Sequence, residues 1–268
     1  MTEQTSKPYS LDGKVVLVTG ASKPDGLGAA FVRAAVKKGA AKVYATGRKV
    51  EAVDFLVKEC GDKVVGKELE VTNSASVHAL AESCKDLQVL INSAGYMGHG
   101  GDTLLGGPMD EAERRKVFDV NIWGALSVSL AFAPILSANT DSSLIVVSSV
   151  GAFTNFGGSM AIYNATNAAK DVLTAGLSAE LAGKVRVGSI YPGPVKTDML
   201  KKGVVDDPKQ AGYLDTAAEP QEFADAAMAY LEAHGPEGGI FGDELGKMCK
   251  VIRDATHAKA SELEMMAY

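Results

Sequence analysis

The sequence predicts a single α/β domain whose parallel sheet is doubly wound, with helices on both faces. Short runs rich in valine, isoleucine and leucine alternate with amphipathic stretches along almost all of its 268 residues. Strands that are apolar on both faces and separated by helices are typical of a parallel sheet covered on both sides. Neither an internal repeat nor a low-complexity tract interrupts the alternation, so we expect one domain over residues 1–268.

Six runs have the composition and length of buried strands. They are KVVLVT (14–19), KVYAT (42–46), KVVGKELEV (63–71), LQVLIN (87–92), SLIVVSS (143–149) and VRVGSIY (185–191). Helical spacing of apolar residues is clear in 47–60, in 75–84 and in 111–136. The expected helices thus fall between the expected strands, as parallel pairing requires.

Two segments have less regular patterns. Residues 93–109 are rich in glycine, and residues 200–219 carry mixed charges with little periodicity. In an open parallel sheet ligands bind at the carboxyl ends of the strands, so both segments could line a site. We interpret 200–219 as a substrate loop because a loop of that length requires a reason, although an ordinary surface loop is the alternative.

The composition is typical of a soluble globular protein. The net charge of −6, from 27 basic and 33 acidic residues, argues against nucleic acid or an anionic membrane as the main partner. The polar start MTEQTSKPYSLDGK is not a signal peptide, and the apolar stretches are shorter than a membrane span. Cys60, Cys84 and Cys249 fit neither a disulfide framework nor a zinc site, and the histidines form no metal-binding pair. We expect no metal and a reducing, cytoplasmic location.

A glycine-rich turn follows the first expected strand. In VLVTGASKPDGLGAAFVRAAVKKGA, Gly20 leaves the strand, while Gly26 and Gly28 open a helix. Glycines permit positive φ and let a diphosphate approach the backbone. The free N–H groups and the positive dipole at the helix start favour that anion. The turn therefore predicts a dinucleotide site.

This turn resembles the Thr-Gly-x-x-x-Gly-x-Gly motif of the short-chain dehydrogenase/reductase family. The resemblance implies a Rossmann-type domain that binds a nicotinamide cofactor. Between Gly20 and Gly26 the chain has five residues, ASKPD, where the family usually has three. Which of Ser22, Lys23 or Asp25 faces the cofactor is therefore open.

The end of the second strand bears on the choice of cofactor. Folds that prefer NAD commonly place an acidic residue there to bind the ribose 2′-hydroxyl, but this chain has Gly47 and Arg48. A guanidinium suits a 2′-phosphate through bidentate, charge-assisted hydrogen bonds. We expect NADP (NADPH), with NAD the less favoured cofactor; the alternative is that Arg48 is a solvent-exposed residue at a helix start.

Further family landmarks follow in order. ELEVTN resembles the segment that contacts adenine, LINSAG resembles the Asn-Asn-Ala-Gly motif with Ser93 for the second asparagine, NIWG (121–124) matches the Asn-x-x-Gly element, and YPGPVKTDM (191–199) matches the Pro-Gly segment. The cofactor-binding residues that the resemblance implies are Gly20, Ser22, Gly26, Leu27, Gly28, Arg48, Glu70, Val71, Asn92, Ala94, Gly95, Tyr163, Asn167, Pro192, Gly193, Val195 and Thr197.

The same resemblance implies the catalytic groups. Hydride transfer to a carbonyl develops negative charge on oxygen, which needs a proton donor and a second hydrogen bond. By resemblance Tyr163 is the acid/base, Ser149 is the oxyanion partner with Ser148 as the alternative, and Asn121 relays protons. Each alone could be structural, but inside this ordered set of motifs a catalytic role is favoured.

Asn167 departs from the family, which has a lysine four residues after the tyrosine. On a helix Asn167 lies on the same face as Tyr163 and can bond the ribose, but it carries no charge. Lys170 lies about 10 Å from Tyr163 along the axis and is not expected to replace the missing cation. Three explanations are open. The enzyme works slowly or on an activated substrate, or another cation, such as Lys196 or Lys23, enters the site. The third is that the redox activity has been lost or replaced, naturally or by engineering.

These expectations define two functions. The first is an NADP-dependent oxidoreductase that interconverts an alcohol and a carbonyl, as a reductase of an aldehyde or ketone. The alternative is an NADP-binding protein with impaired or silenced redox activity that serves as a regulator, scaffold or non-redox catalyst. Helices around 110–136 and 161–182 match those that pair subunits in the family, which implies a homodimer or homotetramer.

Overall fold

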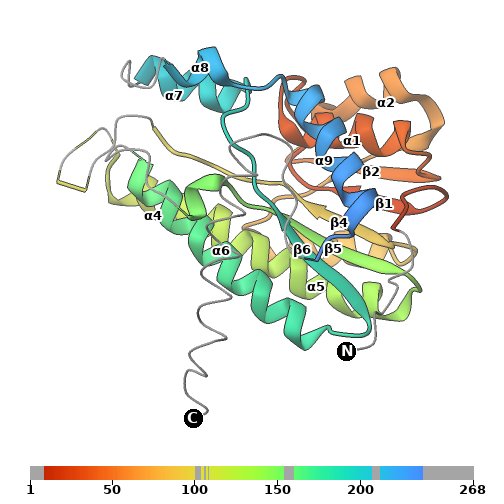
Figure 1. The fold of residues 1–268 in the computed structure, drawn as a ribbon. Helices are drawn as coiled ribbons and strands as arrows, with labels where there is room; N and C mark the ends of the chain where they lie inside the picture. Colours follow the sequence, from red (N-terminus) through yellow and green to blue (C-terminus); the bar gives the residue numbers. More distant parts are fainter. Residues whose placement is uncertain are drawn as a thin grey trace, which may run out of the picture.

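The computed structural model describes residues 9–99, 104–105, 107, 109–153, 160–206 and 212–237. A six-stranded parallel sheet forms the centre, in the order β3-β2-β1-β4-β5-β6 (Figure 1). Its strands are β1 (Val15–Val18), β2 (Lys42–Gly47), β3 (Val64–Glu68), β4 (Val89–Asn92), β5 (Ser142–Val147) and β6 (Val185–Ile190). This confirms the predicted doubly wound parallel fold.

Helices cover both faces of the sheet. Figure 1 shows α1 and α9 together on one side and α4, α5 and α6 on the other. The helices are α1 (Leu27–Lys37), α2 (Asp54–Cys60), α3 (Ser74–Ser83), α4 (Glu111–Phe118), α5 (Ala125–Ala138), α6 (Ala161–Glu180), α7 (Asp198–Asp206), α8 (Gly212–Thr216) and α9 (Pro220–His234). Short turns of 3₁₀-helix occupy Val50–Val53, Gly61–Lys63 and Val150–Ala152.

The two larger hydrophobic cores of the described residues lie on opposite faces of the sheet. One joins the sheet to α1 and α9, where the rings of Phe31 and Phe223 meet edge to face with centroids 6.5 Å apart. The other joins the sheet to α3, α5 and α6 through side chains such as Leu80, Phe132 and Leu177. Strands buried on both faces need such continuous apolar runs, which explains the composition of the strands.

The chain reverses its direction of sheet growth between β1 and β4. β1 pairs with β2 on one side and with β4 on the other, all in parallel. At such a switch point the loops that follow the two strands diverge and leave a crevice at their carboxyl ends. The glycine turn after β1 and the segment after β4 therefore meet at the same edge.

Two predicted segments differ in detail from the observed elements. The expected helix 47–60 begins later, because Gly47 completes β2 and Lys49 is extended, so that a 3₁₀ turn precedes α2. The segment 200–219 contains α7 and α8 instead of irregular chain, and residues 207–211 lie outside the described residues. A parallel bridge between Val195 and Ala218 closes the base of this segment. Of the glycine-rich 93–109, residues 100–103, 106 and 108 also lie outside them.

Glu111–Ala138 forms one long helix that passes without a break through a π-helical segment, Asp119–Gly124. By length and composition alone this helix could span a membrane. In the fold, however, Val128 and Phe132 are completely buried against the sheet and α3. The core helix of a soluble protein has the same composition, so the helix itself is weak support for a membrane span.

Candidate active site

The glycine turn after β1 has the geometry of a phosphate cradle. Gly20 adopts φ +74°, and a Cβ on it would lie 2.8 Å from Ala94 Cα. A Cβ on Gly28 would lie 2.4 Å from the Gly20 carbonyl oxygen. Helix α1 begins at Leu27, and its N-cap Gly26 supplies no side chain to bond the first amides. The free amides and close backbone fit the diphosphate of a dinucleotide.

The longer turn is held against the end of β2. Ala21 donates its N–H to the Thr46 carbonyl oxygen at 2.8 Å. Ser22 lies directly beside Gly47, where a Cβ added at Gly47 would be 3.2 Å from Ser22 Cβ. Of the three candidates left open by the sequence, Ser22 is thus the one beside the second strand.

Lys23 and Asp25 are exposed on the outer part of this turn. Asp25 pairs with Lys201 of α7 at 3.3 Å, and Arg33 donates to the Pro24 carbonyl oxygen at 3.1 Å. Asp25 is therefore held against α7, and Pro24 against α1. Arg48, one residue beyond Gly47, is exposed at the same edge of the sheet.

Asn92 connects three elements by its buried side chain. Its Oδ1 accepts from the Thr19 hydroxyl at 3.0 Å, and its Nδ2 donates to Ala125 O and Ser129 Oγ. The Thr19 oxygen in turn accepts the N–H groups of Ser93 and Ala94, both at 2.9 Å. Asn92 thus shapes the edge of the site, and both of its amide donors are used by the protein.

Glu70 and Val71 have local partners as well. The Glu70 carboxylate accepts from Thr72 N–H at 3.2 Å and from the Thr72 hydroxyl at 2.9 Å. Val71 is buried, and a Cβ on Gly124 would approach Val71 Cγ2 to 2.7 Å. The glycine of NIWG is therefore required by the close contact with Val71.

The Pro-Gly segment after β6 connects the loop after β5 with the start of α7. The Pro192 carbonyl oxygen accepts the N–H of Val150 at 3.0 Å, and Gly193 is half-buried beside it. Val195 is buried, and the Thr197 hydroxyl accepts the N–H of Leu200 at 3.3 Å at the start of α7.

Ser149, not Ser148, hydrogen-bonds the hydroxyl of Tyr163. Ser149 Oγ also accepts the N–H of Gly151 at 3.0 Å. Ser148 is buried and donates to the backbone oxygen of Asn167 at 3.2 Å. Successive residues at a strand end point in opposite directions, so only one of the two serines can face the tyrosine.

Tyr163 has a raised pKa. Desolvation raises it, and this effect exceeds the lowering by hydrogen bonds from the side chains of Asn167 and Ser149. In the part of the chain that the structure describes, no cation contributes to this pKa. The hydroxyl is accordingly protonated at neutral pH and placed to donate.

Asn167 is completely buried one turn after Tyr163. Its Nδ2 donates to the Tyr163 carbonyl oxygen at 3.0 Å, and because that oxygen can only accept, the amide cannot be turned around. Its Oδ1 is buried and has no hydrogen-bond partner among the described residues. A buried acceptor without a donor costs about 1–3 kcal/mol, so this atom fits a ligand group that donates, such as a ribose hydroxyl.

Lys170 binds the backbone of β5 and does not contribute to the pKa of Tyr163. It is buried, and its Nζ donates to the Val147 carbonyl oxygen at 2.8 Å. Burial lowers its pKa to about 8. Lys196 pairs with Glu219 at 2.8 Å, and Lys23 is exposed. None of these three lysines contributes to the pKa of Tyr163. For Lys170 this agrees with the prediction that it does not replace the missing cation.

Asn121 lies in the π-helical segment and is completely buried. Its Oδ1 accepts Tyr96 N–H at 2.7 Å, and its Nδ2 donates to Tyr96 O at 2.8 Å and to Thr166 Oγ1 at 2.9 Å. Gly95 is adjacent, since a Cβ on it would lie 3.6 Å from Asn121 Oδ1. Helical bulges of this type occur frequently at functional sites.

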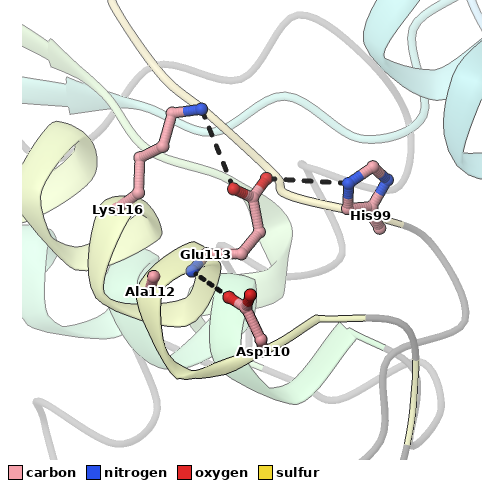
Figure 2. Close-up of a pocket in the computed structure, with 5 residues that line it drawn as sticks. All are labelled: His99, Asp110, Ala112, Glu113 and Lys116. Atoms are coloured by element: carbon pink, nitrogen blue, oxygen red, sulfur yellow. Dashed lines mark hydrogen bonds and ion pairs between the residues drawn. The ribbon is translucent and has the colours of Figure 1, made fainter.

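A polar pocket that the sequence reasoning missed lies at the start of α4. Figure 2 shows its lining, His99, Asp110, Ala112, Glu113 and Lys116, with Glu113 between His99 and Lys116. The two N–O distances to Glu113 are both 3.8 Å, and Tyr96 donates its hydroxyl to the same carboxylate. In the sequence, the closely spaced charged residues of 110–116 were the signal that could have indicated this pocket. Within the described ranges no group of His, Cys, Asp or Glu could hold a metal ion.

A family model described as short chain dehydrogenase matches residues 14–207. The chain belongs to the short-chain dehydrogenase/reductase family. Members of this family are oxidoreductases with a nicotinamide cofactor, and the turn after β1 with the site at the carboxyl edge has their arrangement. The expectation of family and fold is thereby confirmed.

Three similar members illustrate its range. The chain is 31% identical over 245 residues to a 3-oxoacyl-[acyl-carrier-protein] reductase of Vibrio cholerae, covering 88% of this chain and 95% of that protein. A short-chain dehydrogenase of Burkholderia cenocepacia in complex with NADP is 32% identical, with a TM-score of 0.75 over 94% of this chain and 98% of the other. A Brucella melitensis 3-ketoacyl-(acyl-carrier-protein) reductase complexed with NADH is 25% identical, with a TM-score of 0.73 over 87% and 96%.

Lys170→Met is expected to remove a pH dependence of stability from this short-chain dehydrogenase. Burial lowers the lysine pKa from 10.5 to about 8, so between these values the unfolded chain binds the proton more tightly. The free energy of unfolding should therefore rise with pH from about 8 to 10.5 in the unaltered protein relative to the variant. Urea unfolding of both proteins at several pH values between about 8 and 10.5 measures this free energy.

Lys63→Met is the control, because Lys63 is exposed. If the curves of the unaltered protein and of Lys170→Met run parallel across the window, the lysine is charged in the fold without penalty and the interpretation is wrong.

Proposed function

We propose that this chain is an NADP-dependent reductase of an aldehyde or ketone. The observation that carries the proposal is the Tyr163 hydroxyl, protonated and hydrogen-bonded to Ser149 at the carboxyl edge of the sheet. A proton donor beside a second hydroxyl is what a carbonyl oxygen needs while it becomes an alcohol.

The cofactor would be held by residues from several elements. Gly20, Gly28 and the start of α1 would hold the diphosphate, and Arg48 would pair with the 2′-phosphate. Asn167 would accept a ribose hydroxyl at its unpartnered Oδ1. When bound, the reduced nicotinamide supplies a hydride to the carbonyl carbon.

Tyr163 donates the proton to the substrate oxygen, and Ser149 orients that oxygen with a hydrogen bond. Because the tyrosine pKa is raised, the hydroxyl is the populated form at neutral pH and the phenolate is scarce. Alcohol oxidation needs the phenolate as a base, so reduction is the favoured direction. Oxidation should gain as pH rises through the tyrosine pKa.

A second candidate is a cofactor-binding protein whose redox activity is impaired or silenced. The observation in its favour is the uncharged Asn167 beside a tyrosine whose pKa is raised, with no described cation to lower it. Both candidates bind the cofactor, so turnover distinguishes them.

Asn167→Lys should increase the rate of carbonyl reduction by roughly ten- to a hundredfold. The new ammonium group stabilises the phenolate that remains after the proton is given up, so the Tyr163 hydroxyl becomes a stronger acid while it is still protonated at neutral pH. This restores part of the rate factor of about 10²–10⁴ that acid–base catalysis contributes. NADPH consumption would be measured with aldehydes, ketones and diketones. Ala165→Lys is the matched control. Ala165 is exposed on the same helix, so this substitution adds the same charge at a site in contact with solvent.

Turnover by both the unaltered protein and Asn167→Lys, faster in the variant, supports a reductase with a weakened acid. Turnover by the variant alone supports the silenced alternative. Equal rates in a correctly folded variant would refute the electrostatic argument.

Arg48→Ala should weaken NADPH binding about ten- to a hundredfold, as expected for lost hydrogen bonds to a charged phosphate. NADH binding should change little. Calorimetric titration of both cofactors measures the two affinities. Arg115→Ala removes the same charge from an exposed residue of α4 and serves as the control; equal losses for both cofactors would count against the role of Arg48.

We also propose a homodimer or homotetramer formed by the long helix and α6. Phe118, Trp123 and Leu130 on the one and Val172 on the other are exposed apolar side chains. Leu130→Glu should dissociate the oligomer, whereas Val65→Glu, at an exposed apolar residue of β3, should not. Light scattering gives the mass; a monomeric unaltered protein would rule out the assembly.

We propose a cytoplasmic location, because Cys60 and Cys84 are free thiols, as a reducing compartment permits. The net charge of −6 supports a small-molecule carbonyl or alcohol substrate instead of nucleic acid or a membrane.

A further inference from the structure

A buried chain of hydrogen bonds crosses from α6 to the loop after β4. The Thr166 hydroxyl donates to the Tyr163 carbonyl oxygen at 2.7 Å and accepts from Asn121 Nδ2 at 2.9 Å. Asn121 in turn pairs with both the N–H and the C=O of Tyr96, at 2.7 and 2.8 Å. Thr166 and Asn121 are both completely buried.

The direction of every bond in this chain follows from the groups themselves. Tyr96 N–H can only donate and Tyr96 C=O can only accept, so the Asn121 amide has one possible orientation. Its second Nδ2 hydrogen then reaches Thr166, whose own hydrogen is directed to Tyr163 O. A buried network in which every member is satisfied favours one arrangement over others.

The network links two parts of the candidate site that are distant in the sequence. At one end is the helical turn that carries Tyr163. At the other end is the peptide of Tyr96, directly after Gly95 and after Ala94, which lies against Gly20 of the glycine turn. Thr166 is the residue through which the Asn121 amide reaches α6.

We propose that Thr166 is a positioning residue: through Asn121 it holds the Tyr163 helix in register with the Gly95–Tyr96 loop. The expected effect on catalysis rests on the proposed function, whereas the hydrogen-bonded connection from Thr166 through Asn121 to Tyr96 does not depend on it. Loss of the hydroxyl leaves one Asn121 hydrogen without its acceptor and loosens the pairing with Tyr96. A shift of about 1 Å between reacting groups can cost up to about a hundredfold in rate.

Thr166→Val tests the link because it keeps the shape and removes the hydroxyl. The expected result is a kcat lowered by about ten- to a hundredfold with the substrate KM little changed. Hydrogen exchange of the Tyr96 amide, whose acceptor is Asn121, should become about tenfold faster or more. Thr166→Ser restores the hydroxyl and should recover both values.

Thr174→Val is the matched control on the same helix. Thr174 is buried and its hydroxyl donates to Lys170 O at 2.8 Å, one turn back, but it takes no part in this network. It should leave kcat and Tyr96 exchange unchanged. Equal losses in Thr174→Val would mean general loosening of α6 and would overturn the proposal.

Unchanged Tyr96 exchange in Thr166→Val would also overturn it, whatever the rate. If the unaltered protein turns over no carbonyl substrate, the proposed reductase function fails, and the exchange measurement on the same variants still decides the link. NADPH affinity, measured alongside, should fall less than kcat; a loss confined to affinity would contradict a positioning role toward Tyr163.

Discussion

The site depends on the hydrogen bonds that join β1, β4 and α5 at the point where the sheet changes its direction of growth. Thr19, the first residue beyond β1, donates to Asn92 at the end of β4 and accepts the amides of Ser93 and Ala94. Asn92 continues the connection to α5 through Ala125 O. Both residues are buried, so these bonds are shielded from water, and they set where the glycine turn and the loop after β4 face each other.

Charge distribution distinguishes this site from the arrangement implied by family resemblance. The residue one turn after Tyr163 is a neutral amide, and the lysine two turns after it is buried against the backbone of β5. Desolvation then acts on both titratable groups in opposite directions: it raises the tyrosine pKa and lowers the lysine pKa. Each shift favours the uncharged form, as expected when a group loses contact with water and gains no opposite charge.

The loops around the site are connected to one another rather than independent. The enlarged glycine turn reaches α7 through Asp25 and Lys201, and the base of the 200–219 segment is closed by the bridge of Val195 with Ala218. The loop after β4 is held by Asn121 and, through the Tyr96 hydroxyl, by Glu113 of α4. Each of these loops thus has a specific contact with a neighbouring element.

The sequence by itself determined the strand and helix order, the glycine turn and the alignment of motifs along one edge, because these follow from periodicity and from residue types that few conformations accept. It favoured Ser149 but kept Ser148 as the alternative, and it left the choice among Ser22, Lys23 and Asp25 open. It could not show that Asn92 is satisfied by the protein while Asn167 Oδ1 is not. Only the tertiary structure decided which serine partners Tyr163, which turn residue lies beside β2 and which amide atoms have partners. Side-chain direction, desolvation and hydrogen-bond partners arise from contacts between residues far apart in the chain, and local pattern carries no information about them.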